Sequence, residues 1–150
     1  ASILFMGSLI GNPALPSPKA AFAAQGAPRG VFAITRHPMM WGFALWAFAH
    51  ALVMPTGAQL LLSATIAFLA LVGSAGQDAK KARLMGDAWR HWAARTSFVP
   101  FGRQVAGAAP WGDAIPRGHA LFGGILLWLA ATWGHGALGY MAAGIWRWIG

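Results

Sequence analysis

Two long stretches without a charged residue, residues 39–76 and residues 120–146, most constrain what this chain can fold into. About 20 consecutive apolar residues cross a bilayer as a helix, so each stretch is long enough to span a membrane. Charged residues make up only 9% of the chain, whereas soluble domains have about 25%, so side chains for a water-facing surface are too few. The sequence therefore predicts an all-α, polytopic integral membrane protein.

The first stretch indicates a helical hairpin, because a Pro-Thr-Gly turn at residues 55–57 divides it into arms over 39–54 and 58–76. The first arm would be about 24 Å long, slightly less than a bilayer core, and the second is long enough to span. Basic residues flank the open ends of the hairpin, and the turn has none. The positive-inside rule then places residues 12–38 and 77–118 on the cytoplasmic side.

Residues 78–95 predict an interfacial amphipathic helix with basic residues around its polar side. Its apolar side chains recur at helical spacing: Met85, Ala88, Trp89 and Trp92. Asp87 lies three residues before Arg90, so a local ion-pair cluster is favoured over a catalytic role for Asp87. A final transmembrane helix is expected over residues 119–146, with 134–136 as a candidate break.

We expect residues 1–150 to form a single membrane domain. Residues 1–11 are apolar but about half the length of a span, which predicts the end of a longer helix and a fragment that lacks N-terminal helices. The formal net charge of +8 is explained by basic residues beside membrane segments. The expected partners are the lipid bilayer and other membrane proteins, and no nucleic acid is expected.

The first candidate site opens the hairpin, where Thr35, Arg36, His37 and Pro38 follow one another. Pro38 suits the first turn of a helix, so Arg36 and His37 are expected beside free backbone N–H groups at a positive helix end. Arg36 could bind a phosphate or a carboxylate there, and His37 could add a further hydrogen bond. The alternative, equally open, is a helix cap whose charges touch lipid headgroups.

His50 is the second candidate, because an ionisable residue within an apolar arm indicates a function. On a helical wheel it shares a face with Trp46 and other apolar side chains, where a flat aromatic ligand could lie. Imidazole is the usual ligand of heme iron, so His50 is a candidate iron ligand, with Arg36 and His37 as anchors for the propionates. The alternative is a His50 that hydrogen-bonds to a neighbouring helix.

The residues needed for other kinds of catalytic or metal site are scarce in this chain. His119 and His135 are weaker candidates, and the five His show no zinc-binding spacing. The absence of Cys excludes iron–sulfur clusters and thiol catalysis. The only acids are three Asp, which leaves almost nothing for paired-carboxylate catalysis.

The run GVFAITRHPMMWGFALWAFAHALV, with RLMGDAWRHWAARTSFVPF further on and SLIGNPALP before it, resembles the NnrU family of bacterial membrane proteins. The resemblance covers residues 7 to about 103. It implies a protein of the bacterial inner membrane that is associated with nitrite and nitric oxide metabolism, or with an activity like that of the related zeta-carotene isomerase. It also implies heme b as cofactor, with the family's heme-binding His at His50. The second axial ligand of that isomerase lies before the matched region, and His135 is the candidate within this chain.

A more distant similarity links the R-H-P-x-x-x-G pattern to isoprenylcysteine and phospholipid methyltransferases. It implies S-adenosylmethionine as an alternative cofactor, with its carboxylate held by Arg36 and His37. The downstream segment, QDAKKARLMG, lacks the Glu of those enzymes. A third hypothesis is a non-enzymatic accessory protein whose apolar faces pack against partner subunits.

Overall fold

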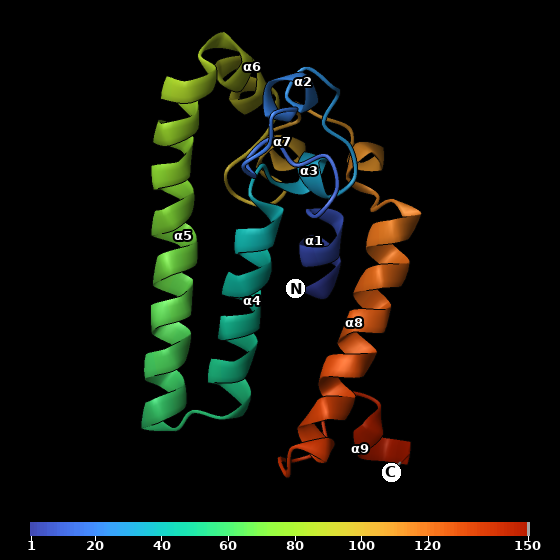
Figure 1. Ribbon diagram of the computed structural model, residues 1–150. Coiled ribbons are helices and arrows are strands. Elements are labelled where there is room, and N and C mark those ends of the chain that lie inside the picture. The colour runs from blue at the N-terminus through green and yellow to red at the C-terminus, as the bar shows by residue number, and fades with distance from the viewer. Residues whose placement is uncertain (150) are drawn as a thin grey trace.

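The computed structural model describes residues 1–149, which form helices and loops and contain no strand within that range (Figure 1). The predicted all-α fold is thus confirmed. The helical elements in chain order are α1 (Ser2–Gly7), α2 (Ala20–Ala23), α3 (Val31–Ile34), α4 (Pro38–Val53), α5 (Gly57–Met85), α6 (Asp87–Arg95), α7 (Gly102–Val105), the 3-10 turn η1 (Trp111–Ala114), α8 (Gly118–Ala137) and α9 (Trp146–Ile149).

Helices α4 and α5 form the predicted hairpin and lie side by side in Figure 1. Pro38 occupies the first turn of α4, where its missing N–H costs nothing. Thr56 caps α5, because its side chain accepts a hydrogen bond from the backbone N–H of Gln59 at 3.3 Å. Each helix of the hairpin therefore begins at a residue whose local chemistry suits a helix start.

Helix α5 is much longer than the predicted arm, which corrects the expected helix over residues 78–95. The helix continues to Met85 and stops at Gly86, whose φ of +55° lies in the left-handed region that glycine adopts readily. The predicted amphipathic segment is thereby divided between the last turns of α5 and the separate helix α6. Helix α6 does bury Trp89 and Trp92, the two aromatic residues expected on its apolar side.

The C-terminal helix also differs from its predicted span. Helix α8 is continuous through residues 134–136 but ends at Ala137 instead of residue 146. Gly139 follows with a φ of +80°, so the chain turns there before α9. The candidate break at 134–136 was wrong because a glycine inside an apolar helix weakens the helix without ending it.

Helix α1 packs between α4 and α8, at the top of the gap between them in Figure 1. Glycines permit this close approach. A Cβ atom on Gly124 of α8 would lie 2.6 Å from the Cα of Ile3, and one on Gly42 of α4 would lie 3.1 Å from the carbonyl oxygen of Ala1. Small residues at helix contacts are typical of packing between membrane helices.

Two helices, α5 and α8, are long and apolar enough to cross a membrane, and α4 is a shorter apolar helix. Large apolar side chains cover their outer surfaces, and Leu61, Phe122 and Leu126 each remain about 70% exposed. The buried core instead gathers at one end of the molecule, where α2, α3, α6 and α7 lie together in Figure 1. This end holds the first candidate site.

Candidate functional site

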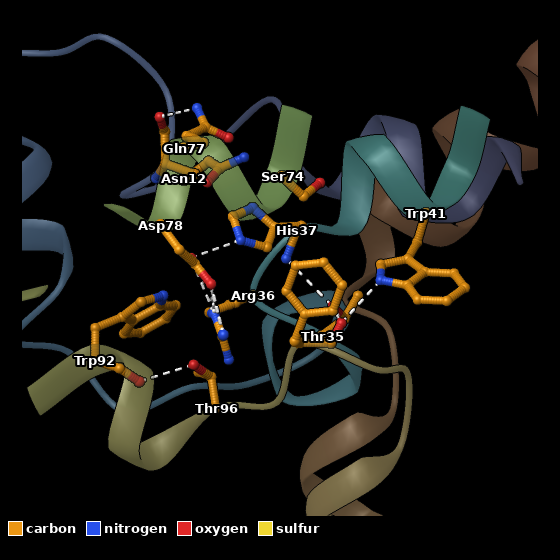
Figure 2. Close-up of polar contacts among 12 residues, drawn as sticks. Asn12, Thr35, Arg36, His37, Trp41, Ser74, Gln77, Asp78, Trp92 and Thr96 are labelled. Carbon is orange, nitrogen blue, oxygen red and sulfur yellow. Dashed lines mark hydrogen bonds and ion pairs between the residues drawn. The ribbon is translucent and has the colours of Figure 1, made fainter. Parts of the chain in front are cut away.

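A partly buried ion-pair cluster joins the start of α4 to the last turns of α5. The Asp78 carboxylate accepts hydrogen bonds from Nη2 of Arg36 at 2.6 Å and from Nε of Arg36 at 2.9 Å. His37 Nε2 lies 2.7 Å from the other carboxylate oxygen. Figure 2 shows the carboxylate between the two basic side chains. We call these three residues the Arg36–His37–Asp78 cluster.

The chain segment after α6 holds this cluster in place. The carbonyl oxygen of Phe98 accepts two hydrogen bonds, from Oγ1 of Thr35 at 2.7 Å and from Nε1 of Trp41 at 2.8 Å (Figure 2). The backbone N–H of Arg36 donates to the carbonyl oxygen of Ser97 at 2.8 Å. Thr35 has an extended backbone, and His37, the residue before the proline, stays out of helical geometry, so this segment can pair with the second one.

Aromatic rings enclose the cluster. The ring centroid of His37 lies 5.5 Å from that of Phe98 and 6.3 Å from that of Trp89. The guanidinium carbon of Arg36 lies 5.4 Å from the ring centroid of Phe98. The His37 side chain is fully buried, and its Nδ1 atom has no hydrogen-bond partner. A charge in such surroundings needs a close partner, which the carboxylate supplies.

Asp78 lies beyond the first 20 or so residues of α5, the length that crosses a bilayer. Burial by itself would raise the pKa of Asp78. The hydrogen bonds from His37 and Arg36 and their positive charges outweigh burial, so the pKa lies below its ordinary value. The carboxylate is therefore ionised whenever the cluster is formed near neutral pH.

The cluster changes the interpretation of Arg36 and His37. The sequence predicted that they bind an external anion, and the structure places an internal anion, Asp78, against both. Asp78 was not predicted as a site residue, because it lies 42 residues from Arg36 in sequence. The available signal was the scarcity of acids, since Asp78 is the acid nearest in sequence to the open end of the hairpin.

The structure brings His50 together with His135, and both are half-buried. Their ring centroids are 6.0 Å apart, although the residues lie on different helices, α4 and α8. The ring of His50 also stacks on Trp46, with 3.9 Å between the ring centroids, and the two residues were predicted to share one face of the helix.

In both imidazoles the Nδ1 atom forms a hydrogen bond with the backbone. His50 Nδ1 lies 2.9 Å from the carbonyl oxygen of Trp46, and His135 Nδ1 lies 2.9 Å from the carbonyl oxygen of Ala131. A carbonyl oxygen only accepts, so each Nδ1 carries the proton and donates. With the Nδ1 proton held in this way, Nε2 is the ring nitrogen of each imidazole that a metal ion would bind.

The structure does not bring Arg36 and His37 to His50. Thirteen residues of helix separate His37 from His50, which corresponds to about 20 Å along α4. This separation exceeds the reach from heme iron to its propionates. Arg36 and His37 therefore cannot anchor the propionates of a heme whose iron is bound by His50.

The remaining candidates have simpler surroundings. Asp87 and Arg90 form an exposed ion pair at 2.5 Å, as expected for a local charge cluster. Among residues 1–149, no group of three or more His, Asp or Glu side chains is arranged to hold a metal ion. His119 lines a pocket beside Arg117, near the start of α8.

The sequence of this chain is similar to one protein family and to one curated protein. The model of the NnrU family, described as "NnrU protein", matches residues 1–143 and so extends well beyond residue 103. The chloroplast 15-cis-zeta-carotene isomerase of Arabidopsis thaliana is 36% identical over 83 residues, which cover 51% of this chain and 22% of that protein. The chain thus spans less than a quarter of this curated relative. No solved structure gives a significant match.

Proposed function

Because the chain belongs to the NnrU family, we propose that it is a polytopic membrane protein with a carotenoid-isomerase-like activity that depends on heme b held between α4 and α8. The family match and the partial similarity to a zeta-carotene isomerase support this class of activity. The single observation that carries the proposal is the pair formed by His50 and His135, whose rings face each other from two helices.

The residues around this pair fit a heme. Two imidazoles whose Nε2 atoms make no hydrogen bond are a ligand set that heme iron accepts. Trp46 provides a flat aromatic wall beside His50. The surrounding surfaces of α4 and α8 are apolar, as a porphyrin requires. When bound, the heme would supply a redox-active iron to the site.

The contribution of the protein is to orient and activate the two ligands. The hydrogen bonds from Nδ1 to the backbone make each imidazole more basic and hold its ring orientation. Stacking on Trp46 restricts the His50 side chain further. A long polyene could reach the same place along the exposed apolar faces of α4 and α8.

The proposed topology keeps residues 12–38 and 77–118 on the cytoplasmic side of a bacterial inner membrane. Helices α4 and α8 then both run away from the cytoplasm, so His50 and His135 lie near the opposite membrane surface. An association with nitrite or nitric oxide metabolism would use the same heme. Methyl transfer is less favoured, because Asp78 already occupies the guanidinium that would hold the carboxylate of S-adenosylmethionine.

The test is an absorption spectrum, before and after dithionite, of the full-length protein purified in mild detergent after expression with supplied heme. We expect a Soret band that His50→Ala abolishes and His135→Ala shifts or weakens. His91→Ala, which changes an exposed His on α6, is the matched control and should leave the spectrum unchanged. A Soret band that persists unaltered in His50→Ala would contradict the proposal. Chromatography of cis-carotenoids incubated with the heme-loaded protein then tests the activity.

A further inference from the structure

A cavity lies at the end of the molecule that holds the buried core, away from His50. Its cavity volume is about 370 Å³. Its walls are formed by the loop after α1, the segment around α2, the start of α3, Trp92 of α6 and the start of α8. We call it the basic pocket, because four basic residues line it: Lys19, Arg29, Arg117 and His119.

The charge of the basic pocket is positive and largely uncompensated. None of its lining residues is acidic. Arg29 pairs with Asp113 at a long 3.4 Å, and the Arg29 side chain remains 61% exposed. Within the described residues, the side chains of Lys19 and Arg117 have no hydrogen-bond partner. The positive charge of these side chains therefore favours an anionic ligand in the pocket.

The walls of the basic pocket are apolar. Val31, Trp92 and Ala120 are buried residues that line it, and the Nε1–H group of Trp92 has no acceptor. Two lining side chains, Ile10 and Phe22, are 63% and 76% exposed. An inorganic anion would contact the basic residues but would leave the apolar side chains exposed to water. A ligand that joins an anionic group to a hydrocarbon chain matches both features.

The position of the pocket indicates the source of such a ligand. Helix α8, one of the two helices long enough to span a membrane, begins at Gly118 beside the pocket. Its first exposed apolar residues, Leu121 and Phe122, follow within one turn. A hydrocarbon chain leaving the pocket along α8 would thus pass directly into the bilayer.

We propose that the basic pocket binds the phosphate headgroup of one anionic phospholipid, while an acyl chain of that lipid lies against Ile10, Phe22 and the first turns of α8. Lys19, Arg29 and Arg117 supply charge-assisted hydrogen bonds to the phosphate oxygens. This inference rests on the proposed membrane location but not on the heme, so its failure leaves the Soret test unaffected.

Native mass spectrometry of the full chain in detergent tests the proposal by counting bound phosphatidylglycerol, phosphatidylcholine or inorganic phosphate in separate titrations. We expect one phosphatidylglycerol to bind about tenfold or more tightly than phosphatidylcholine. The double variant Lys19→Gln/Arg117→Gln should weaken phosphatidylglycerol binding by about tenfold or more and leave phosphatidylcholine binding unchanged.

A matched control separates this site from general attraction to anionic lipid. Lys80→Gln/Arg83→Gln also removes two exposed basic residues without a described partner, but outside the pocket. An equal loss of phosphatidylglycerol binding in this control would overturn the proposal, because it would indicate surface electrostatics alone.

The apolar half of the proposal has its own variant. Phe22→Ser should weaken binding of phosphatidylglycerol and leave any binding of inorganic phosphate unaltered. Since Phe22 is highly exposed, its substitution should not impair folding, so this variant remains informative even if the double variant fails to fold. Full competition by inorganic phosphate, with no effect of Phe22→Ser, would assign the pocket to a free anion and overturn the proposal of a lipid.

Discussion

Removing the negative charge of Asp78 should destabilise the hairpin strongly. In Asp78→Asn, Arg36 and His37 would lose the carboxylate that lies within 2.9 Å of both. Removing one partner of a buried ion pair costs about 3–5 kcal/mol. The side chains of Arg36 and Asp78 are 16% and 21% exposed, so water offsets part of this loss. We expect the free energy of unfolding to fall by about 2–4 kcal/mol.

The chain contains a matched control in its other Asp–Arg pair. Asp87 also pairs with an arginine, Arg90, but the two side chains are 81% and 62% exposed. Asp87→Asn should therefore lower the free energy of unfolding by less than about 0.5 kcal/mol. Both variants can be compared by titrating the protein from mild detergent into dodecyl sulfate while following far-UV circular dichroism. Equal effects of the two substitutions would refute the reasoning, since burial is the difference between the pairs.

Two further predictions concern packing and pH. Gly124→Ala should destabilise the protein by about 1–3 kcal/mol in the same titration, because the added Cβ would lie 2.6 Å from the Cα of Ile3. Gly134→Ala, on the same helix with nothing within 4 Å, should be neutral or stabilising, and the reverse order would contradict the packing of α1 on α8. Because folding lowers the pKa of Asp78, its contribution is complete above its ordinary pKa and is lost as the pH falls through the lower folded value. Thermal unfolding of the wild type and of Asp78→Asn should therefore converge as the pH falls below about 4.

The features that the sequence predicted well are those that depend on local chemistry. The turn at residues 55–57 and the proline at position 38 set the ends of the hairpin arms through neighbouring backbone geometry alone. The apolar spacing of Trp89 and Trp92 likewise predicted which side of α6 is buried. The division at Gly86 was missed, because helical periodicity runs through a glycine whether or not that glycine takes a positive φ.

The features that the sequence did not predict depend on tertiary contacts. Asp78 contacts Arg36 and His37 only because α5 continues past the expected membrane surface. No local sequence pattern predicts this extension of the helix. The contact of His50 with His135 depends on how far α8 lies from α4, and the glycines that pack against α1 influence that spacing. Such distances arise from packing between helices and not from periodicity within one helix.

The ion pair between Arg36 and Asp78 has a consequence for biogenesis. Arg36 leaves the ribosome before either arm of the hairpin, whereas Asp78 follows both arms. A nascent chain that ends after α4 therefore carries two basic side chains without their carboxylate. Pairing becomes available only when α5 has been synthesised as far as Asp78, so this contact forms late and marks completion of the hairpin.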